Sequence, residues 1–347
     1  MKFLIIRFSS IGDIVLTTPV VRCLKKQLPL SEVHYLVKPK FKQVIEPNPY
    51  IDKIHVLQDD WKKMIDELKE EKFDYTIDLH HNLRTFRVKR DLKIPSYSVN
   101  KLNFRKFIFT KLKWNVMPKH QHIIDRYMET VKPFGVVNDG AGMDYFIPKD
   151  QETTLKDIPA SHHLGYIAIV IGASYYTKKL PVYKLQELCR AIDHPIILLG
   201  GGQQEFEEGE QIASIDPIKI YNACEKFSLH ESADLIRKSK LVISHDTGMM
   251  HMAAALKKPV IAVWGSTVPS FGMTPYYGEN YLANHAQPCD NVEVHKLWCR
   301  PCTKFGKNHC PQGHFKCMKN ISIEEIVRNM NKGLSVYSPV GDIRERG

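Results

Sequence analysis

Three polar residues follow a short apolar segment in the second half of the chain and open the next predicted helix. The segment 241–244 (LVIS) is typical of a buried parallel strand. Asp246, Thr247 and Gly248 then fill the turn before a helix, where backbone N–H groups and the helix dipole attract anions. A side chain in place of Gly248 would hold a phosphate away from the backbone. The pattern favours a phosphate-binding turn, with ordinary helix capping by Asp246 or Thr247 as the alternative.

A second polar turn lies near the N-terminus. Residues 2–8 (KFLIIRF) read as a first strand, 9–13 (SSIGD) as a tight loop, and 14–28 as a helix. Asp13 is therefore expected at the carboxyl end of the first strand, where open α/β sheets bind their ligands. Its carboxylate suits a general base that projects into a cleft, although it could also only begin the helix.

Four cysteines and one histidine lie close together towards the C-terminal end. Cys299 and Cys302 form a CxxC pair, and Cys310, His314 and Cys317 follow at spacings compatible with a tetrahedral zinc site. Disulfides are not expected in a reducing compartment. The four cysteines are therefore either ligands of a structural zinc ion or reduced thiols on a loop.

Alternating apolar and amphipathic segments predict an α/β fold with parallel sheets. A polar stretch with two prolines, 148–165, separates two such runs and indicates a domain boundary. We expect an N-terminal domain over 1–155, a second domain over 156–320, and a C-terminal helix and tail over 321–347. A chain of 347 residues is long enough for two such cores.

The final helix has predicted limits at both ends. The sequence SIEE (322–325) is a capping box that begins a helix. We expect this helix to continue to about Asn331, with Gly333 as its stop.

The positive charge of the chain is concentrated in one segment. The segment from Arg84 to Arg126 contains twelve Lys and Arg and only two acidic residues, Asp91 and Asp125. Its net charge is therefore +10, out of +11 for the whole chain. Within it, 101–114 (KLNFRKFIFTKLKW) interleaves aromatic residues with cations, which suits a membrane surface or a phosphorylated lipid. The alternative is a solvated helix face whose aromatic residues pack inward. Nucleic acid is not expected as a partner, because no zinc-finger, RRM or KH signature accompanies the basic residues.

Targeting signals are not evident in the sequence. No apolar run approaches the roughly 18 residues needed to span a bilayer. The N-terminal segment carries Arg7 and Asp13 where a signal peptide needs an apolar core. We therefore expect a cytoplasmic protein, peripheral to the inner membrane if the basic segment binds lipid.

Both polar turns also belong to a set of motifs that resembles glycosyltransferase family 9, the bacterial heptosyltransferases of lipopolysaccharide core assembly. Their order and spacing are kept over most of the chain. The motifs are IIRFSSIGDIVLTTPVV (5–21), IDLHHNLRT (77–85), GASYYTKKLP (172–181), LLGGGQQE (198–205) and SHDTGMMHMAAALKKPVIAVWGST (244–267). The resemblance implies a GT-B fold, in which two Rossmann-like domains with parallel sheets face a central cleft.

The resemblance also implies roles for individual residues. Asp13 would be the catalytic base. The donor-binding residues would be Lys178, Glu205, Asp246, Thr247, Gly248 and His251. Lys178 would lie near the diphosphate, with the adjacent Lys179 as a substitute, and Glu205 would bind a ribose. The basic segment supplies four acceptor-binding candidates, which are Arg84, Arg87, Arg105 and Lys106.

The function implied is inverting transfer of a heptose from ADP-heptose to the phosphorylated inner core of lipopolysaccharide, with no cofactor required for catalysis. Two departures leave the sugar and acceptor open: His245 stands where asparagine is common, and 84–130 aligns loosely. Alternatives are a transferase that uses another nucleotide sugar and a nucleotide-sugar epimerase of the same fold. An epimerase would not need the basic segment. A Rossmann oxidoreductase is disfavoured, because SSIGD lacks the GxGxxG fingerprint.

Overall fold

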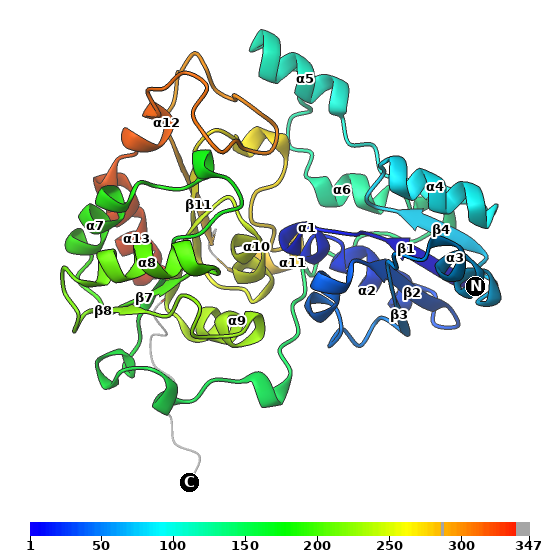
Figure 1. Cartoon of the computed structure of the whole chain (residues 1–347), viewed down its shortest axis with the longest axis horizontal. Coiled ribbons are helices and arrows are strands. Elements are labelled where there is room, and N and C mark those ends of the chain that lie inside the picture. Colours follow the sequence, from blue (N-terminus) through cyan, green and yellow to red (C-terminus); the bar gives the residue numbers. More distant parts are fainter. Residues whose placement is uncertain (286–287, 338–347) are drawn as a thin grey trace. The chain divides into compact units, whose positions relative to one another are not determined.

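The computed structural model describes residues 1–285 and 288–337. Contacts divide the chain into two compact units, each of which is an α/β structure (Figure 1). The first unit comprises Met1–Asp150, Ala254–Leu256 and Pro269–Asn284, and the second comprises Gln151–Ala253, Lys257–Val268 and the described residues from His285 onward. No helix within the described ranges combines the length and the apolar character needed to cross a membrane.

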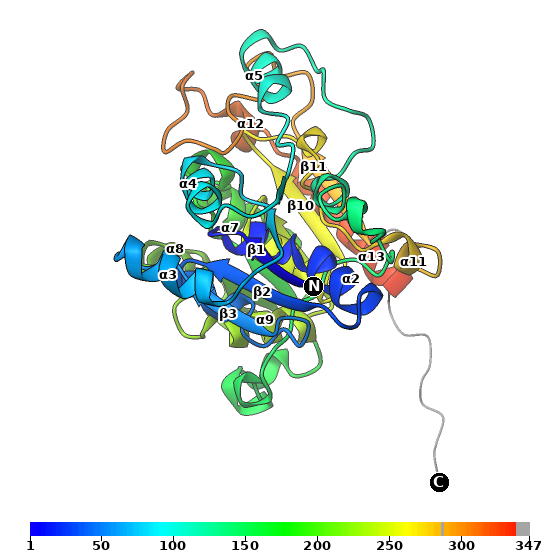
Figure 2. The ribbon, with the colours of Figure 1, turned by 90° about the vertical axis from the view of Figure 1, so that its right-hand side faces the viewer.

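The first unit is built on a five-stranded parallel sheet in the order β3-β2-β1-β4-β5. Figure 2 shows β3, β2 and β1 side by side. Its strands are β1 (Lys2–Ile6), β2 (Glu32–Val37), β3 (Lys53–Val56), β4 (Tyr75–Asp78) and β5 (Ser96–Ser98). Apolar side chains on both faces of the central strand β1 are fully buried. Leu4 and Ile6 pack in a cluster with residues of α3 (Trp61–Glu70) and α4 (Leu83–Leu92), whereas Phe3 contacts Phe134. Burial on both faces explains the continuous apolar run in the sequence.

The helix predicted over 14–28 is wrong as a single element. The structure has α1 (Ile11–Val15) and α2 (Thr18–Gln27), with Pro19 in the first turn of α2. Proline has no backbone N–H to continue the helical bonding. The Thr18 hydroxyl instead donates to the Val15 carbonyl at 2.8 Å, so a side chain satisfies an acceptor that the backbone leaves open.

A buried arginine on α2 anchors a segment that is distant in sequence. Arg22 is 2% exposed and pairs with Asp139 and Asp144, and it also donates to the Gly142 carbonyl at 2.8 Å. Burial opposes the charged guanidinium, but these partners outweigh it and raise the pKa of Arg22. The loop after residue 138 is thereby fixed to the first unit.

The second unit is built on a six-stranded parallel sheet in the order β11-β10-β9-β6-β7-β8. Its strands are β6 (Ile167–Val170), β7 (Ile196–Leu199), β8 (Ile220–Asn222), β9 (Leu241–His245), β10 (Val260–Trp264) and β11 (Cys289–Glu293). The helices that alternate with them include α7 (Val182–Ala191), α8 (Gln203–Ala213), α9 (Leu229–Lys238) and α10 (Gly248–Ala255). The alternation of strands and helices agrees with the sequence pattern.

The final helix, α13 (Ile323–Tyr337), is longer than predicted. Ser322 does cap its start, because its hydroxyl accepts a bond from the Glu325 backbone N–H at 3.1 Å. The stop at Gly333 is wrong, since this glycine lies inside the helix. A Cβ atom there would lie 2.9 Å from Leu241 Cδ1, so Gly333 lets the helix pack closely against β9. The predicted tail beyond 337 lies outside the described residues.

The segment Pro269–Asn284 returns from the second unit to the first. It includes α11 (Glu279–Leu282) and bonds to residues near α6 (Ile123–Met128): the Ile123 backbone N–H donates to the Gly272 carbonyl at 2.7 Å. Asn280 likewise bonds to the backbone of Gly140 and Asp139. These bonds explain why contacts group 269–284 with the first unit, although the sequence places it within 156–320.

Candidate functional site

Asp13 lies in the first turn of α1, directly after the carboxyl end of β1. Its Oδ1 pairs with Arg7 Nη2 at 2.6 Å, and its Oδ2 accepts bonds from the hydroxyl and backbone N–H of Ser10 at 2.8 and 3.2 Å. The Asp13 side chain remains 24% exposed. The carboxylate is therefore held in one orientation while part of it is still accessible to a ligand.

Arg7 holds the Asp13 carboxylate in place through their ion pair. The sequence analysis did not assign a role to Arg7. It is 7% exposed, and its Nη1 donates to the Leu79 carbonyl at 2.6 Å and to the Tyr127 hydroxyl at 3.1 Å. Its ion pair with Asp13 outweighs the cost of burial and raises the pKa of Arg7. Arg7 thus joins the ends of β1 and β4 to helix α6 and positions Asp13.

His80 is a further polar group at this edge of the sheet. It follows β4, which is the neighbour of β1, so its side chain lies at the same carboxyl edge as Asp13. Burial, with Arg7 and Lys101 nearby, lowers the pKa of His80 to about 4. Its Nδ1 has no hydrogen-bond partner among the described residues. His80 was missed, although its place after a strand adjacent to β1 is a signal that the rule for open sheets provides.

In the second unit, Lys178 and Asp246 form an ion pair. Lys178 Nζ lies 2.6 Å from Asp246 Oδ2, which also accepts a bond from the Thr267 hydroxyl at 2.8 Å. The three residues follow β6, β9 and β10, and β6 and β9 are the adjacent strands at which the strand order reverses. Such a reversal is where open α/β sheets bind their ligands.

The turn that carries Lys178 is fastened to the end of β10. The Thr177 hydroxyl lies 2.9 Å from that of Ser266, and the Thr177 carbonyl accepts a bond from the Ser266 backbone N–H. A Cβ atom at Gly265 would lie 2.5 Å from the Thr177 carbonyl oxygen. Glycine at 265 therefore allows the close approach that holds Lys178 beside Asp246.

Glu205 lies in the first turn of α8, after β7. Its Oε1 is 3.0 Å from Lys179 Nζ, which also pairs with Glu208 at 2.8 Å. The two glutamates outweigh burial and raise the pKa of Lys179. A Cβ atom at Gly200 would lie 2.9 Å from the Cβ of Glu205, so the glycine run leaves room for this carboxylate over the strand ends. The two neighbouring lysines thus have different partners, and Lys178 is the one at Asp246.

The remaining donor candidates lie around α10. Gly248 is the first residue of this helix, and the Thr247 hydroxyl lies 3.4 Å from that of Ser244. His251 lies on the same helix and is buried, at 3% exposure. His245 is also buried: its Nε2 accepts a bond from the Leu180 backbone N–H at 2.9 Å, and burial lowers its pKa to about 4. His245 therefore holds the segment after Lys178 as a neutral ring.

The four acceptor candidates lie on two helices of the first unit. Arg84 and Arg87 are on α4, where the Arg87 guanidinium lies over the Trp61 ring at 4.1 Å. Arg105 and Lys106 are on α5 (Asn103–Leu112), where the Lys106 ammonium lies over the Phe271 ring at 5.6 Å. The four candidates therefore form two pairs, one on α4 and one on α5.

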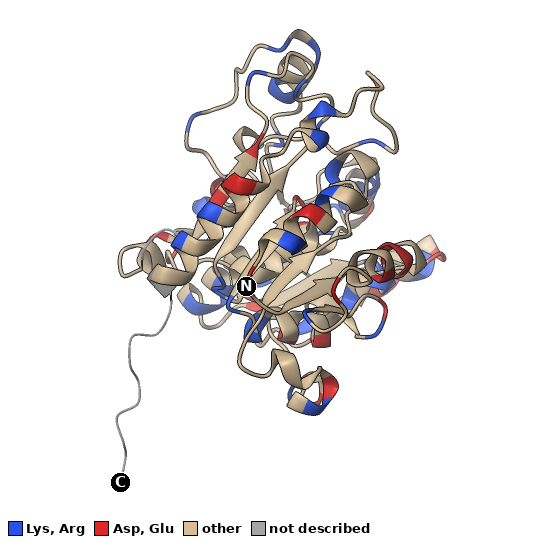
Figure 3. Ribbon diagram, turned by 90° about the vertical axis from the view of Figure 1, so that its left-hand side faces the viewer, with Lys and Arg blue, Asp and Glu red and all other residues tan. Residues whose placement is uncertain are grey.

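Helix α5 and the residues after it expose most of their aromatic side chains. Phe104, Phe107 and Trp114 are 75%, 56% and 68% exposed, whereas Phe109 is buried against Phe271. Lys and Arg lie between these aromatic residues in the sequence. Figure 3 marks the Lys and Arg residues in blue. The alternative in which the aromatic residues pack inward holds for Phe109 only.

One of the cysteines near the C-terminal end, Cys299, lies beside His314. No disulfide joins any of the eight cysteines, all of which lie in the described part of the chain. Cys299 Sγ lies 3.7 Å from His314 Nε2. Burial raises the pKa of the Cys317 thiol to about 12, and the nearby thiols of Cys302, Cys310 and Cys299 affect the same group. Among the described residues, however, the three side chains whose possible metal-ligand atoms all lie within 4.8 Å of one another are His34, His55 and Glu71, and no cysteine belongs to such a group.

Comparisons with known proteins show the family to which the chain belongs. The sequence profile of glycosyltransferase family 9 (heptosyltransferase) matches residues 61–303. The chain is 27% identical over 301 residues to lipopolysaccharide heptosyltransferase 1 of Campylobacter coli, which covers 78% of this chain and 85% of that protein.

Solved structures show the same fold. The family 9 glycosyltransferase of Veillonella parvula DSM 2008 superposes with a TM-score of 0.73 at 22% identity, over 96% of this chain and 97% of that one. The E. coli heptosyltransferase WaaC with ADP gives a TM-score of 0.65 at 19% identity, over 96% and 100% of the two chains. With a matching profile over well more than half of its length, the chain belongs to glycosyltransferase family 9, the heptosyltransferases, and its two parallel-sheet domains have the GT-B fold.

Proposed function

We propose that this enzyme transfers a heptose from ADP-heptose to the inner core of lipopolysaccharide, with inversion at the anomeric carbon. The observation that carries the donor assignment is the Lys178 and Asp246 pair, at the point where the strand order reverses and directly before α10. A lysine and the N–H groups of a helix start offer positive charge to a diphosphate. The related E. coli structure with ADP supports the choice of nucleotide.

In the proposed reaction, Asp13 accepts the proton of an acceptor hydroxyl. The hydroxyl oxygen forms a bond to the anomeric carbon of the donor as the bond from that carbon to ADP breaks. Lys178 and the backbone N–H groups of Thr247 and Gly248 stabilise the negative charge that develops on the departing diphosphate. Asp246 binds hydroxyl groups of the sugar, and Glu205 binds the ribose. No step uses a metal ion or cofactor.

Arg7 contributes orientation and charge to this mechanism. Its ion pair with Asp13 places a positive charge 2.6 Å from the carboxylate oxygen Oδ1. The bonds from Arg7 to Leu79 and Tyr127 then limit the movement of that carboxylate. A base that is already positioned increases the reaction rate, because no conformational entropy is lost in orienting it during the reaction.

For the acceptor, we propose that α5 contacts the membrane surface on which the phosphorylated precursor lies. Three exposed aromatic side chains alternate with Arg105, Lys106 and other cations along this helix and the residues after it. Aromatic rings suit the headgroup region, and cations are attracted to anionic lipids. This would place the enzyme at the inner face of the membrane from the cytoplasmic side.

The direct test is binding and transfer by the purified enzyme. Calorimetry should detect binding of ADP, with UDP and GDP binding at least tenfold more weakly. Incubation with ADP-heptose and the core oligosaccharide from a deletion strain should add one heptose, as measured by mass spectrometry. Preferred binding of UDP or GDP would overturn the ADP assignment. In a separate test of metal dependence, a chelator should leave the turnover number unchanged.

We also propose that the cysteine cluster holds a structural zinc ion. In a tetrahedral site with Zn–S and Zn–N bonds of ordinary length, a sulfur and a nitrogen ligand lie roughly 3.6 Å apart. The 3.7 Å between Cys299 Sγ and His314 Nε2 fits this value. Two of the three thiolates of Cys302, Cys310 and Cys317 would complete the four ligands, and the ion would stabilise the fold without entering the reaction.

Elemental analysis tests the zinc proposal. The purified enzyme should contain about one equivalent of zinc, and a chelator should lower its melting temperature. Cys302→Ser should reduce the zinc content, whereas the same change at Cys23, buried on α2, should not. Substoichiometric metal in the wild-type protein would leave the cysteines as reduced thiols.

A further inference from the structure

Two histidines and a glutamate lie together on one face of the sheet of the first unit. His34 and Leu36 are alternate residues of β2, and Leu36 is paired in register with His55 of β3. Alternate residues and paired residues share a face of a sheet, so the two histidines lie on the same side. Leu36 packs there against residues of α3, and Glu71 directly follows this helix. The glutamate therefore reaches the two rings from the end of the helix that covers them.

The possible metal-ligand atoms of these three side chains converge. His34 Nδ1 lies 3.0 Å from His55 Nε2 and 3.8 Å from Glu71 Oε2. One ligand atom from each side chain lies within 4.8 Å of the other two. In a tetrahedral site with Zn–N and Zn–O bonds of ordinary length, two ligand atoms lie roughly 3.3 Å apart. The two measured distances lie on either side of this value, so a small movement of the side chains would place all three atoms around one ion.

The two rings are in the form that binds metal ions. His34 is 3% exposed, and His55 is half-buried. Burial lowers the pKa of His34 and lowers that of His55 to about 4. Both rings are therefore neutral at pH 7, and a neutral imidazole offers the lone pair of one nitrogen to a metal ion.

Neighbouring groups orient the rings. His34 Nε2 lies 3.5 Å from Glu32 Oε2, so a proton on this nitrogen faces a carboxylate while Nδ1 faces the other two ligand atoms. Metal-bound histidines commonly direct their second nitrogen to a carboxylate in this way, which fixes the tautomer. The edges of both rings also contact Phe73, with ring centroids 5.1 and 5.9 Å away. These contacts restrict the rotation of His34 and His55.

Two lysines compete for the glutamate and limit the affinity for a metal ion. Lys53 pairs with Glu71 Oε1, and Lys2 Nζ lies 3.5 Å from Glu71 Oε2. Lys2 also pairs with Glu32 at 2.9 Å, so it keeps a partner when Glu71 Oε2 turns to a metal ion. Lys53 is 57% exposed and can remain on the other oxygen. We therefore expect an ion that binds reversibly when metal is added.

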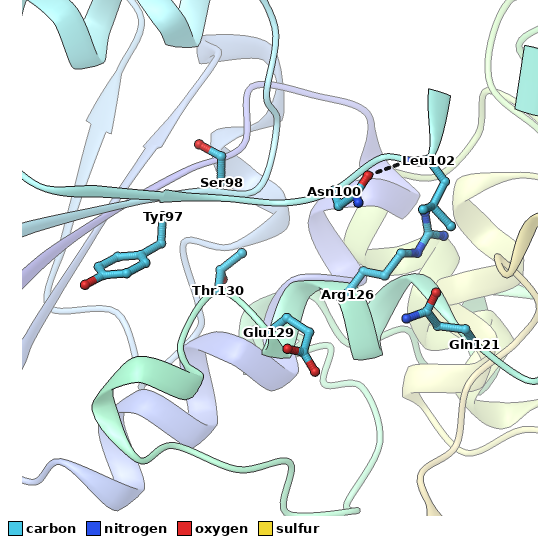
Figure 4. Close-up of a pocket in the computed structure, with 8 residues that line it drawn as sticks. All are labelled: Tyr97, Ser98, Asn100, Leu102, Gln121, Arg126, Glu129 and Thr130. Carbon is cyan, nitrogen blue, oxygen red and sulfur yellow. Dashed lines mark hydrogen bonds between the residues drawn. The ribbon is translucent and has the colours of Figure 1, made fainter. Parts of the chain in front are cut away.

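The cluster is separate from the groups that we assign to the reaction. Helix α3 connects the parallel strands β3 and β4, so its end at Glu71 lies at the amino edge of the sheet. Asp13 instead follows the carboxyl end of β1. The pocket in Figure 4 is lined by Tyr97 and Ser98 of β5, which is the opposite edge strand from β3. An ion in the cluster would therefore stabilise the first unit without contacting the reacting groups.

We propose that His34, His55 and Glu71 bind a zinc ion, with a water molecule as its fourth ligand. Two histidines and one carboxylate are a ligand set that zinc accepts, and three protein ligands leave one tetrahedral position for water. Imidazole nitrogens favour zinc over magnesium or calcium, which prefer oxygen ligands. The ion would join β2, β3 and the end of α3. This proposal does not depend on the donor or the acceptor of the transferase.

Titration of the full-length protein with zinc chloride tests the site. Calorimetry should show one zinc ion bound per chain beyond the zinc that the purified protein retains, and the melting temperature should rise. His55→Gln and Glu71→Gln each remove one ligand and should lower the affinity for the added zinc at least tenfold. His295→Gln is the matched control, because this exposed histidine lies 3.9 Å from the Glu293 carboxylate but belongs to no such group of three described side chains. It should change the affinity less than twofold.

The outcomes separate this site from the cysteine cluster. Cys302→Ser should lower the zinc that the purified protein retains and leave the binding of added zinc unchanged. If His55→Gln or Glu71→Gln does not fold, cobalt(II) added to the wild-type protein gives a second measurement. Nitrogen and oxygen ligands should give visible absorption bands without the near-ultraviolet charge-transfer bands of thiolate ligands. Added zinc that binds equally well to both variants, no binding of added zinc, or thiolate bands from the added cobalt would overturn the proposal.

Discussion

At the scale of single residues, the two sites use the same device, a carboxylate held by a cation. Arg7 holds Asp13 in the first unit, and Lys178 holds Asp246 in the second. The two pairs differ in what their cation can do next. Arg7 is buried and bonded on several sides, whereas Lys178 follows a short turn and is 15% exposed. Arg7 is therefore suited to positioning, and Lys178 to meeting a ligand.

Replacing Asp13 tests the proton acceptor. Asp13→Asn keeps the shape of the side chain but removes its basicity, so kcat should fall by roughly 10²- to 10⁴-fold. The affinity for ADP, measured by calorimetry, should remain within twofold. Asp150→Asn, at an exposed position, serves as the control and should retain wild-type turnover. Wild-type turnover in Asp13→Asn would remove Asp13 from the mechanism.

Replacing Lys178 tests the diphosphate site. A hydrogen bond to a charged group contributes about 1.5 to 3 kcal/mol, so Lys178→Ala should weaken ADP binding by about 10- to 100-fold. The rise in melting temperature on adding ADP should shrink accordingly. Lys156→Ala, an exposed lysine of the same unit, should bind ADP as the wild type does. Equal ADP affinity in both variants would place the diphosphate elsewhere.

How much of the site the sequence could predict depends on how local the signal is. Asp13 and the 246–248 turn stand at the ends of apolar strands, which is a local pattern. Lys178 and Glu205 have no such pattern and came from the family resemblance. Arg7 could not be recognised as the residue that positions Asp13, because its bonds to Leu79 and Tyr127 join segments that are distant in sequence.

At the scale of elements, α5 and the residues after it expose the aromatic side chains Phe104, Phe107 and Trp114, which do not pack in the core. If α5 contacts anionic lipid, each Lys or Arg near the surface contributes on the order of 1 kcal/mol, and added salt weakens the attraction. Changing Arg105, Lys106, Lys111 and Lys113 to Glu should abolish binding to vesicles that contain anionic lipid. The acceptor KM should rise while the affinity for ADP stays unchanged, because the residues that we propose for ADP binding belong to the other unit.

A matched control for these four reversals is available on α13. Lys332 and Arg328 lie on that helix, outside the basic segment, and their reversal to Glu should leave vesicle binding intact. Vesicle sedimentation at low and high salt is the measurement. Binding that survives the four reversals, or that does not respond to salt, would mean that α5 is an ordinary solvated helix.

The order of strands and helices could be predicted from the sequence, but some limits could not. The break between α1 and α2 is caused by Pro19 and the two threonines before it. The spacing of apolar residues, on which the helix prediction depended, does not reveal such a break. Gly333 looked like a helix end because glycine is common there. Its real reason is close packing against Leu241, a contact about ninety residues away in sequence.

At the scale of the whole molecule, partly and fully buried histidines should make the free energy of unfolding depend on pH. Burial lowers the pKa of His55, His80 and His245 to about 4. In the unfolded chain such groups bind protons near pH 6.5, so the unfolded state gains protons first as the pH falls. Stability is therefore full above pH 6.5 and is lost as the pH falls towards 4. Each histidine should contribute a loss of roughly 2 kcal/mol between pH 7 and pH 5.

Urea unfolding at pH 7 and pH 5 measures this loss. His245→Gln keeps an acceptor for the Leu180 N–H but cannot be protonated, so it should reduce the loss by roughly the 2 kcal/mol of one histidine. His163→Gln, at an exposed position, should have the same pH dependence as the wild type. Equal losses in all three proteins would assign the pH dependence to other groups.

From the sequence we predict two α/β domains, over 1–155 and 156–320, with a boundary within 148–165, and contacts place the first change of unit between Asp150 and Gln151. The return of 269–284 to the first unit could not be predicted, because nothing in a strand and helix pattern says which unit a connection packs against. This return has a consequence for how the protein is made. The ribosome completes residues 1–150 long before it reaches 269–284, and at ordinary elongation rates the interval is on the order of ten seconds.

During that interval the emerging N-terminal half lacks the carbonyl of Gly272, the ring that covers Phe109 and the carbonyl that receives Arg126. We expect a fragment of residues 1–150 to be cut by protease near α5 and α6, and the full-length chain to resist. A fragment that resists as well as the whole chain would contradict this. The first unit therefore completes its packing only after residues 269–284 have been synthesised. A nascent chain arrested before residue 269 would leave the surface that this segment covers accessible to chaperones.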